Sequence, residues 1–252
     1  MKKVYFIGAG PGDPELITMK GARLLSEADV VIYAGSLVNP AVLDSLKDDC
    51  ARHDSAAMTL EDVLAVMLPA AQAGKTVVRL HSGDPSIYGA IREQLTILEK
   101  HGINYEIIPG VSSFTAAAAS LGREYTLPGV SQTVILTRME GRTPVPAGQE
   151  ISSLATHGAS MAIFLSVQMI EKVVDALLEG YTKDTPVAVV QRASWPQERI
   201  IRGTLGNIAG QIKEQDITRT ALILVGDFLG DDFELSLLYD GSFSHGFREA
   251  KQ

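Results

Sequence analysis

Two short loops rich in glycine, proline and aspartate carry the residues of this sequence that are best suited to chemistry. The first is GAGPGDP at residues 8–14, and the second is HSGDPSIYG at residues 81–89. Glycine and serine let a ligand approach the backbone closely, proline fixes its own φ, and aspartate offers a fixed acceptor. Such loops suit a ligand that carries positive charge and hydrogen-bonds to peptide groups, with Asp84 as one acceptor.

The spacing of the first loop argues against two common ligands. In the dinucleotide fingerprint the sixth position must be small, but counting from Gly8 it is Asp13, which would repel an anion. The next helix is expected to start only near Thr18, too late to present its amides to a phosphate. A P-loop is excluded because no GK[ST] triplet occurs. S-adenosylmethionine, with its ammonium, adenine and sulfonium, fits the loops, although ordinary turn glycines explain them equally well.

The elements expected to position these loops form a parallel sheet. Each loop follows an apolar strand, Lys3–Gly8 or Val77–Leu80. Strand, glycine turn and helix recur through the first half of the chain. The predicted helices are 18–28, capped by Thr18, about 60–73 after the capping pattern at Thr59, 86–100, and an alanine-rich helix ending at Gly122. This order predicts a doubly wound sheet whose carboxyl edge gathers the loops.

The second half predicts a separate α/β domain. The pattern lapses after Arg123, which places a boundary near Pro128 and gives domains 1–127 and 128–252. Predicted strands follow at 133–137, 160–165, 186–191, 199–203 and 221–226, with a helix at 167–179. The two strands joined across Trp195 resemble a hairpin, so this sheet should be mixed. We therefore expect two α/β domains enclosing a cleft, and an aromatic tail after Asp231 that packs against one of them.

Composition limits the partners. The chain has 252 residues, of which 46% are hydrophobic and 21% charged, as in globular proteins. Its apolar runs are too short to cross a bilayer, so we expect a cytoplasmic protein with no membrane partner. The net charge of −8 disfavours nucleic acid. A single cysteine, Cys50, excludes an internal disulfide, and the histidines lack metal-ligand spacing, so no metal is expected.

Seven segments together resemble one family. They are VYFIGAGPGDPELIT, ADVVIYAGSLV, HDSAAMTLEDV, RLHSGDPSIYGA, IIPGVSSFTAAAA, VVQRASWPQERIIRGTL and LYDGSFSHGFR, and they span essentially the whole chain. They resemble the tetrapyrrole methylases. The YAGSLV and DSAAMTLED segments and the tail near His245 resemble the branch that methylates a corrin precursor in cobalamin synthesis.

The resemblance implies a methyl donor, S-adenosylmethionine, that becomes S-adenosylhomocysteine, a tetrapyrrole substrate and a homodimer. It implies donor contacts in several turns, at Pro11, Ser82, Gly83, Asp84, Ile87, Ser112, Ser113, Ser166, Ala193, Thr220 and Ala221. Two positions depart from the family pattern, because many relatives have glycine in place of Ser82 and several in place of Ala193. Both residues are small, so each position still allows a donor contact through the backbone.

Methyl transfer from a sulfonium to carbon needs positioning and exclusion of water more than a nucleophile. We expect Asp84, Tyr33 and Ser36 at the reaction site, and His81 is the histidine nearest to it. Arginines suit the substrate's carboxylates, and those near predicted strand ends or loops are Arg79, Arg123, Arg138, Arg142 and Arg192. Trp195 is expected to be a packing residue. Three alternatives remain open: a methylase of the same family that acts on another tetrapyrrole position, one that acts on ribosomal RNA or protein, and a tetrapyrrole carrier without catalysis.

Overall fold

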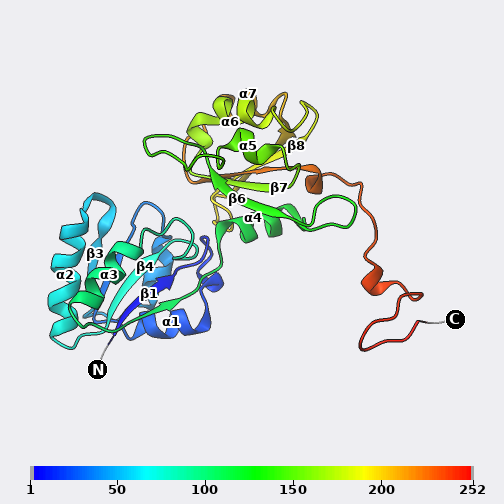
Figure 1. Ribbon diagram of the computed structural model, residues 1–252. Helices are drawn as coiled ribbons and strands as arrows, with labels where there is room; N and C mark the ends of the chain where they lie inside the picture. The colour runs from blue at the N-terminus through cyan, green and yellow to red at the C-terminus, as the bar shows by residue number, and fades with distance from the viewer. Residues whose placement is uncertain (1–2, 251–252) are drawn as a thin grey trace. The chain divides into compact units, whose positions relative to one another are not determined.

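A computed structural model describes residues 3–250, which divide into two compact units (Figure 1). Unit 1 comprises the described residues up to Ala117 together with Arg192–Glu198, and unit 2 comprises Ala118–Gln191 and the described residues from Arg199 onward. The division by contacts falls inside helix α4 (Ser113–Leu121), whereas the sequence placed a boundary at residues 127–128. Both positions lie on the same connection, α4 and the loop that follows it.

Unit 1 contains a five-stranded sheet in which all strands are parallel. Its strands are β1 (Val4–Gly8), β2 (Val30–Tyr33), β3 (Ala51–Asp54), β4 (Val77–His81) and β5 (Tyr105–Ile108). Their order across the sheet is β3-β2-β4-β1-β5. The parallel N-terminal sheet predicted from sequence is confirmed. The prediction lacked β3 (Ala51–Asp54), because three of its four residues are polar and three are exposed.

Alternation along the strands decides which helix covers which face. Tyr5 and Ile7 of β1 pack with α1 (Met19–Ser26) and the 3-10 helix η2 (Pro40–Ser45). Val4 and Phe6 point the other way and pack with α2 (Leu60–Gln72) and α3 (Arg92–Lys100). Successive strand residues face opposite sides, so two apolar cores form, one on each face of the sheet. The unit is therefore doubly wound.

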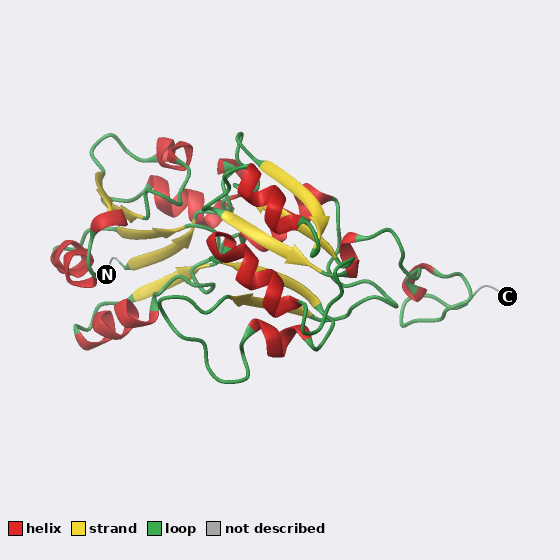
Figure 2. Cartoon of the chain, turned by 90° about the horizontal axis from the view of Figure 1, so that it is seen from above, coloured by secondary structure: helices red, strands yellow, loops and turns green. Residues whose placement is uncertain are grey.

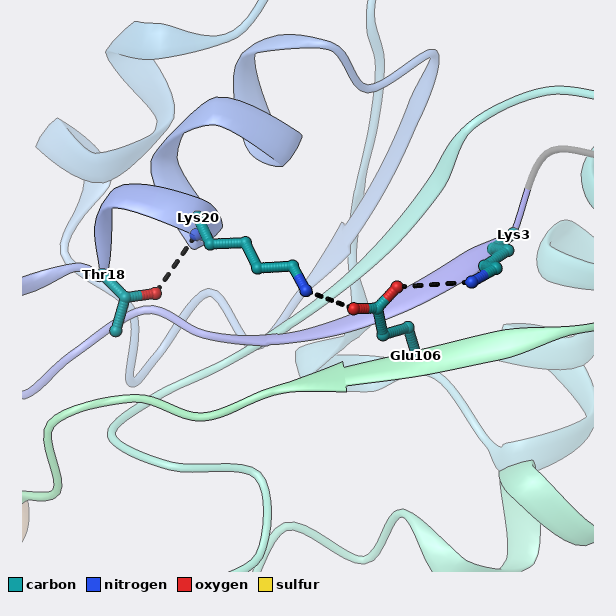
Figure 3. A network of polar contacts seen from close by, with 5 residues as sticks. Lys3, Thr18, Lys20 and Glu106 are labelled. Carbon is teal, nitrogen blue, oxygen red and sulfur yellow. Dashed lines mark hydrogen bonds and ion pairs between the residues drawn. The ribbon is translucent and has the colours of Figure 1, made fainter.

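An ion-pair network ties α1 to the edge strand β5 (Figure 3). The Glu106 carboxylate on β5 accepts hydrogen bonds from Lys20 at the start of α1 and from Lys3, the latter at 3.5 Å. Thr18 caps α1, accepting from the Gly21 amide at 3.1 Å, as the sequence predicted. These pairs are exposed or half-exposed, so each stabilises the fold by about 1 kcal/mol at most.

The helix predicted at residues 86–100 is shorter in the structure, where α3 begins at Arg92. Between Ser86 and Ile91 the chain folds into a tight turn with Tyr88 at φ 55° and Ala90 at φ 48°. A Cβ atom on Gly89 would lie 2.1 Å from the Pro85 carbonyl oxygen, so the chain returns onto itself there. The apolar spacing continued through this turn, which is why periodicity alone predicted a helix.

Unit 2 contains a mixed five-stranded sheet of order β6-β7-β10-β8-β9. Its strands are β6 (Val134–Arg138), β7 (Ser160–Phe164), β8 (Pro186–Gln191), β9 (Arg199–Thr204) and β10 (Ala221–Val225). Only β6 and β7 pair in parallel, and β8 and β9 form the predicted hairpin. Helices α5 (Ile151–Ala155), α6 (Ile170–Leu177) and α7 (Ile208–Glu214) share one core with the sheet. The mixed sheet is confirmed, while the short α5 was not predicted.

The C-terminal tail was expected to pack against one domain, and that prediction is wrong. Tyr239 is 83% exposed and Phe247 is fully exposed. Within the described residues, the last hydrogen bond from the tail to the rest of unit 2 joins the Glu234 amide to the Pro128 carbonyl oxygen. Beyond it the tail is a loop with one short helix, η6 (Leu237–Tyr239) (Figure 2), and the hydrogen bonds of residues 235–250 join parts of the tail to one another, several of them at Arg248. Aromatic content indicated burial, but in the structure these side chains are exposed.

Candidate functional site

Three loops converge at the carboxyl edge of the unit 1 sheet. The loop after β1 and the loop after β4 are joined by two backbone hydrogen bonds between Gly10 and Gly83, of 2.7 and 3.3 Å. Gly110, in the turn after β5, touches both loops. A Cβ atom on Gly8 would lie 2.5 Å from the Gly83 carbonyl oxygen and 2.6 Å from the Gly110 Cα, so the backbones meet at a distance that no side chain permits.

This position is a topological switch point. The connection from β1 leads to α1 on one face of the sheet, whereas the connection from β4 leads to α3 on the other face. Neighbouring strands whose connections leave in opposite directions open a crevice above their carboxyl ends, which is where ligands bind in open α/β sheets. The predicted convergence of the two glycine loops is therefore a property of the fold.

The Asp84 carboxylate fastens two of these loops together. One of its oxygens accepts from the Gly110 amide at 2.8 Å, and the other accepts from the Ser86 amide at 2.7 Å and from the Ser86 hydroxyl. Burial alone would raise the pKa of Asp84, but the hydrogen bonds from the Ser86 hydroxyl, the Gly110 amide and the Ser86 amide outweigh it and hold that pKa below its usual value. Asp84 therefore carries a negative charge at the junction of the loops.

The predicted donor contacts fall into two groups, one in each unit. Unit 1 brings together the residues on its converging loops. They are Pro11, Ser82, Gly83, Asp84, Ile87, Ser112 and Ser113, with Ala193 in the segment 192–198 that belongs to the same unit. Pro11, Gly83, Ser112 and Ala193 are buried in the structure.

The second group lies at one end of the unit 2 sheet. The antiparallel register of β7 and β10 pairs Ile163 with Ile223, which brings Ser166 level with Thr220 and Ala221 just beyond the paired residues. The Ser166 hydroxyl is fully buried and is used within the fold, because it donates to the Phe164 carbonyl oxygen at 2.6 Å and accepts from the Met139 amide at 2.8 Å. A ligand would meet Ser166 through its backbone rather than its hydroxyl.

Tyr33 and Ser36 lie at the neighbouring corner, where β2 and β3 end side by side. The Tyr33 carbonyl oxygen accepts from the Ser55 hydroxyl at 3.0 Å, and the Gly35 amide donates to the Asp54 carboxylate at 2.9 Å. Ser36 is exposed in this corner. The YAGSLV and DSAAMTLED segments, which lie apart in the sequence, therefore form one structure at the carboxyl edge.

The side chains of His81 and Arg79 are both buried in unit 1, although His81 is the last residue of β4. His81 is 7% exposed, stacks on Phe6, and has no hydrogen-bond partner on its buried Nε2 atom. Burial, followed by the charge of Arg79, lowers the pKa of His81 to about 3. Its ring is neutral near pH 7, so a role as proton relay does not fit. Arg79 donates to the Ile32 carbonyl oxygen, and burial lowers its pKa to about 10.

The other arginines suggested for the substrate's carboxylates differ in their existing partners. Arg123 forms an ion pair with Asp231 at 2.7 Å. Arg138 donates to three carbonyl oxygens of its own loop, those of Met139, Thr143 and Pro144. Within the described residues the exposed Arg142 and Arg192 form no ion pair with a carboxylate, and the Arg192 guanidinium lies 5.7 Å from the centre of the Trp195 ring.

Sequence reasoning missed two features at these edges. One is strained backbone, since Tyr88, Leu165 and Thr220 have φ between 53° and 56°, a region that residues other than glycine rarely adopt. No sequence signal marks such residues. The other is a contact between Trp195 and the first loop. The Trp195 indole nitrogen donates to the Pro11 carbonyl oxygen at 2.8 Å. Trp195 packs, as predicted, but on the loop itself.

Two further findings concern sites elsewhere. A cavity of about 300 Å³ lies in unit 2 between the start of α6 and the end of α7, lined among others by Met169, Lys172 and Ile217, and contains none of the predicted site residues. Within residues 3–250 no cluster of three or more histidine, cysteine or acidic side chains is arranged to hold a metal ion. None of the helices in that range is long and apolar enough to cross a membrane.

The converging loops present small residues and peptide groups at their tips. A Cβ atom built on Gly83 would have its nearest neighbours at 3.6–3.9 Å, in the Val111–Ser113 turn, so that turn approaches Gly83 without filling the space beside it. The residues at the loop tips, Ser82, Gly83, Ser112 and Ser113, are small, and peptide groups make up most of what they present. A negative charge at Asp84 suits a donor with ammonium and sulfonium groups.

Comparison with known proteins adds independent information. The family model of the Tetrapyrrole (Corrin/Porphyrin) Methylases matches residues 3–209. The chain is 56% identical over 251 residues to a cobalt-precorrin-4 C(11)-methyltransferase of Methanocaldococcus jannaschii, covering 99% of this chain and 97% of that protein. It is 49% identical over 246 residues to a precorrin-4 C(11)-methyltransferase of Pseudomonas aeruginosa, covering 97% and 98%.

Solved structures agree with these relatives. A cobalt precorrin-4 methyltransferase superimposes with a TM-score of 0.89 at 46% identity, covering 91% of this chain and 96% of that one. A uroporphyrin-III C-methyltransferase from Thermus thermophilus, solved with S-adenosylhomocysteine, gives a TM-score of 0.76 at 29% identity, covering 90% and 98%. The two-unit fold is thus shared along nearly the whole chain.

Proposed function

This chain belongs to the tetrapyrrole (corrin/porphyrin) methylase family, and from that membership we propose that it methylates precorrin-4 or cobalt-precorrin-4 at carbon 11 in cobalamin biosynthesis, using S-adenosylmethionine. The observation that carries the choice of substrate is 56% identity across 99% of the chain to a cobalt-precorrin-4 C(11)-methyltransferase. The glycine loops at the switch point support the same conclusion, since they offer peptide groups and one negative charge to a cationic donor.

The proposed donor contacts are those on the two groups of loops. In unit 1 they are Pro11, Ser82, Gly83, Asp84, Ile87, Ser112, Ser113 and Ala193, and in unit 2 they are Ser166, Thr220 and Ala221. Close approach of the loop backbones in unit 1 supports this assignment, and so does the shared sheet end of the three residues in unit 2. We assign Asp84, Tyr33 and Ser36 to the reaction site.

When bound, S-adenosylmethionine supplies a methyl group on a sulfonium, which is already a good leaving group. The chain's own residues therefore need to position the donor and the substrate and to exclude water. Asp84 contributes by holding the loops after β4 and β5 in one arrangement and by keeping a negative charge there. Arg142 and Arg192, which are exposed, are the arginines that we assign to the substrate's carboxylates.

The test is incubation of the purified protein with labelled S-adenosylmethionine and either precorrin-4 or cobalt-precorrin-4, followed by mass spectrometry and NMR of the macrocycle. The expected product carries one added methyl group at carbon 11, with S-adenosylhomocysteine released in equal amount. Label in ribosomal RNA or protein instead, or tight binding of the macrocycle without transfer, would contradict the proposal. Comparing rates with the two macrocycles identifies the natural one.

We also propose that the protein is a cytoplasmic homodimer. Seven large apolar side chains of the tail are at least 40% exposed, namely Phe233, Leu235, Leu237, Leu238, Tyr239, Phe243 and Phe247. Aromatic side chains bury roughly 150–250 Å² each, so those of the tail approach the about 800 Å² per partner of a stable interface. Light scattering should give twice the chain mass of 27.0 kDa, and the mass of one chain would contradict the dimer. Cell fractionation tests the location.

A further inference from the structure

The segment between β8 and β9 lies on the first glycine loop. Its residues, Arg192–Glu198, belong to unit 1, although both strands that it joins belong to unit 2. The Trp195 indole nitrogen donates to the Pro11 carbonyl oxygen at 2.8 Å, and the Ser194 hydroxyl accepts from the Asp13 amide at 3.0 Å. Two hydrogen bonds therefore tie this segment to the residues on either side of Gly12.

The indole also fits Gly12 by shape. A Cβ atom on Gly12 would lie 1.9 Å from the Cδ1 atom of Trp195, a distance at which the ring would have to leave. The Gly12 carbonyl oxygen accepts from the Asn39 side-chain amide at 2.8 Å. Polar backbone groups of three successive loop residues are thus bound by side chains from two other segments, which fixes the conformation of the loop.

The segment maintains this contact in spite of strained backbone. Arg192 and Ser194 have φ of 52° and 67°, a left-handed conformation that is unfavourable for residues other than glycine. Within the segment, the Ser194 amide donates to the Glu198 carboxylate at 2.7 Å, and the Arg192 guanidinium lies over the Trp195 ring. Strain of this kind persists only where surrounding contacts fix it, and it concentrates at functional positions.

The fixed loop continues directly into the converging corners. Gly10, one residue before Pro11, makes both backbone hydrogen bonds to Gly83. Gly83 in turn lies in the loop that Asp84 fastens to Gly110. A change of conformation at residues 11–13 therefore reaches the loop after β4 through a single residue.

We propose that Trp195 is a positioning residue that holds the first glycine loop in the conformation that receives the methyl donor. The proposal rests on the proposed function, because it names what the donor loop depends on. A loop that reaches its binding conformation only part of the time lowers the apparent affinity by that fraction. The loss should appear in donor binding, and in Trp195→Phe, which keeps an aromatic ring beside Arg192, it should appear there alone.

The experiment compares Trp195→Phe, which keeps a flat ring over Gly12 but lacks the N–H donor, with Trp195→Ala, which lacks both. Binding of S-adenosylhomocysteine is measured by calorimetry. One neutral hydrogen bond contributes about 0.5–1.5 kcal/mol, so the phenylalanine variant should bind roughly 2–13-fold more weakly and the alanine variant more weakly still. Gln197→Ala is the matched control, since Gln197 is exposed in the same segment and should leave binding unchanged.

Steady-state kinetics separate positioning from a general loss of structure. The KM for S-adenosylmethionine should rise in both Trp195 variants, while the KM for the tetrapyrrole should stay constant in Trp195→Phe, which keeps an aromatic ring beside Arg192. Partial unfolding would instead lower the active fraction and reduce kcat alone. The phenylalanine variant keeps the test decisive if the alanine variant does not fold. Unchanged donor binding in Trp195→Phe and Trp195→Ala, with binding intact in the unmodified protein, overturns the positioning role alone.

A double-mutant cycle with Gly12→Ala tests the contact itself. Gly12→Ala displaces the indole, so it should weaken donor binding as Trp195→Ala does, and the double variant should be no weaker than either single one. Additive losses would show that Gly12 and Trp195 act separately and would overturn the proposal. Failure of the unmodified protein to bind S-adenosylhomocysteine would instead remove the donor assignment, and this inference with it.

Discussion

The Asp84 carboxylate is at once the most chemically suggestive side chain of the loops and a structural fastener. Its oxygens accept hydrogen bonds from Gly110 and Ser86. An acid at such a junction can serve a cationic ligand only if the fold already keeps it charged, and these donors do so by lowering its pKa. Binding and stability at this residue are therefore linked and need separate measurements.

Asp84→Ala should destabilise the protein as well as weaken donor binding. Hydrogen bonds to a charged group contribute about 1.5–3 kcal/mol, and burial of Asp84 is partial, so we expect a loss of roughly 2–4 kcal/mol in the free energy of unfolding. Urea unfolding measures it. Ser86→Ala, which removes the hydroxyl donor and leaves both amide donors, should cost less than Asp84→Ala, and an equal or larger loss would contradict the fastening role.

The buried His81 should make the protein less stable in acid. Its folded pKa of about 3 lies below the ordinary value of 6.5, so the unfolded chain binds the proton more readily. The contribution of neutral His81 to the free energy of unfolding is then fully present above pH 6.5. It falls, by up to about 1.4 kcal/mol per pH unit, as the pH drops toward 3. The difference in unfolding free energy between the unmodified protein and His81→Phe should follow this slope. The exposed His157, replaced by glutamine, is the control, and a pH-independent difference for His81→Phe would contradict the assignment.

At the scale of elements, the turn between β4 and α3 is where sequence and structure diverge most. Residues 86–91 continue the apolar spacing of a helix, yet Tyr88 and Ala90 adopt φ of 55° and 48°. Periodicity reports which side chains face a core, and it carries no information on the backbone of a non-glycine residue. The capping residues Thr18 and Thr59 were predictable because their chemistry is local, and the structure confirms both.

Ala90→Gly should stabilise the protein. An L-residue in left-handed backbone costs roughly 1–2 kcal/mol, more than the entropy that glycine loses on folding, so the gain is up to about 1 kcal/mol. The matched control is Ala119→Gly in α4, an exposed helical position, where the same substitution should cost about 1 kcal/mol. Thermal unfolding of both variants measures the two signs, and destabilisation by Ala90→Gly would show that the turn is not strained.

At the scale of the whole molecule, the sequence predicted both sheets, apart from β3, because most strands carry an apolar pattern of their own and several end in a glycine-bearing turn. The mixed sheet followed from one hairpin, across Trp195. Two things were not predictable. The first is the contact of residues 192–198 with the rest of unit 1. It joins residues that are far apart in the sequence, such as Pro11 and Trp195, so no local sequence pattern predicts it. The second is the exposure of the tail, whose aromatic residues indicated burial.

Removing the tail should change association and not folding. A chain that ends after Glu234 keeps the Arg123–Asp231 ion pair and the Glu234 hydrogen bond, and it loses no residue of the described hydrophobic cores. Its thermal unfolding should match that of the full chain measured at low concentration, while light scattering should report single chains. A truncated chain that still pairs would show that the dimer surface lies elsewhere, and a lower unfolding temperature would show that the tail stabilises the fold.

The chain contains one tryptophan, and it lies against Gly12. Indole emission from the intact, unlabelled protein therefore originates at a single loop, with no signal from other tryptophans to subtract. Opening or closing of that loop can be followed by stopped-flow fluorescence in real time, with the native residue as the optical reporter.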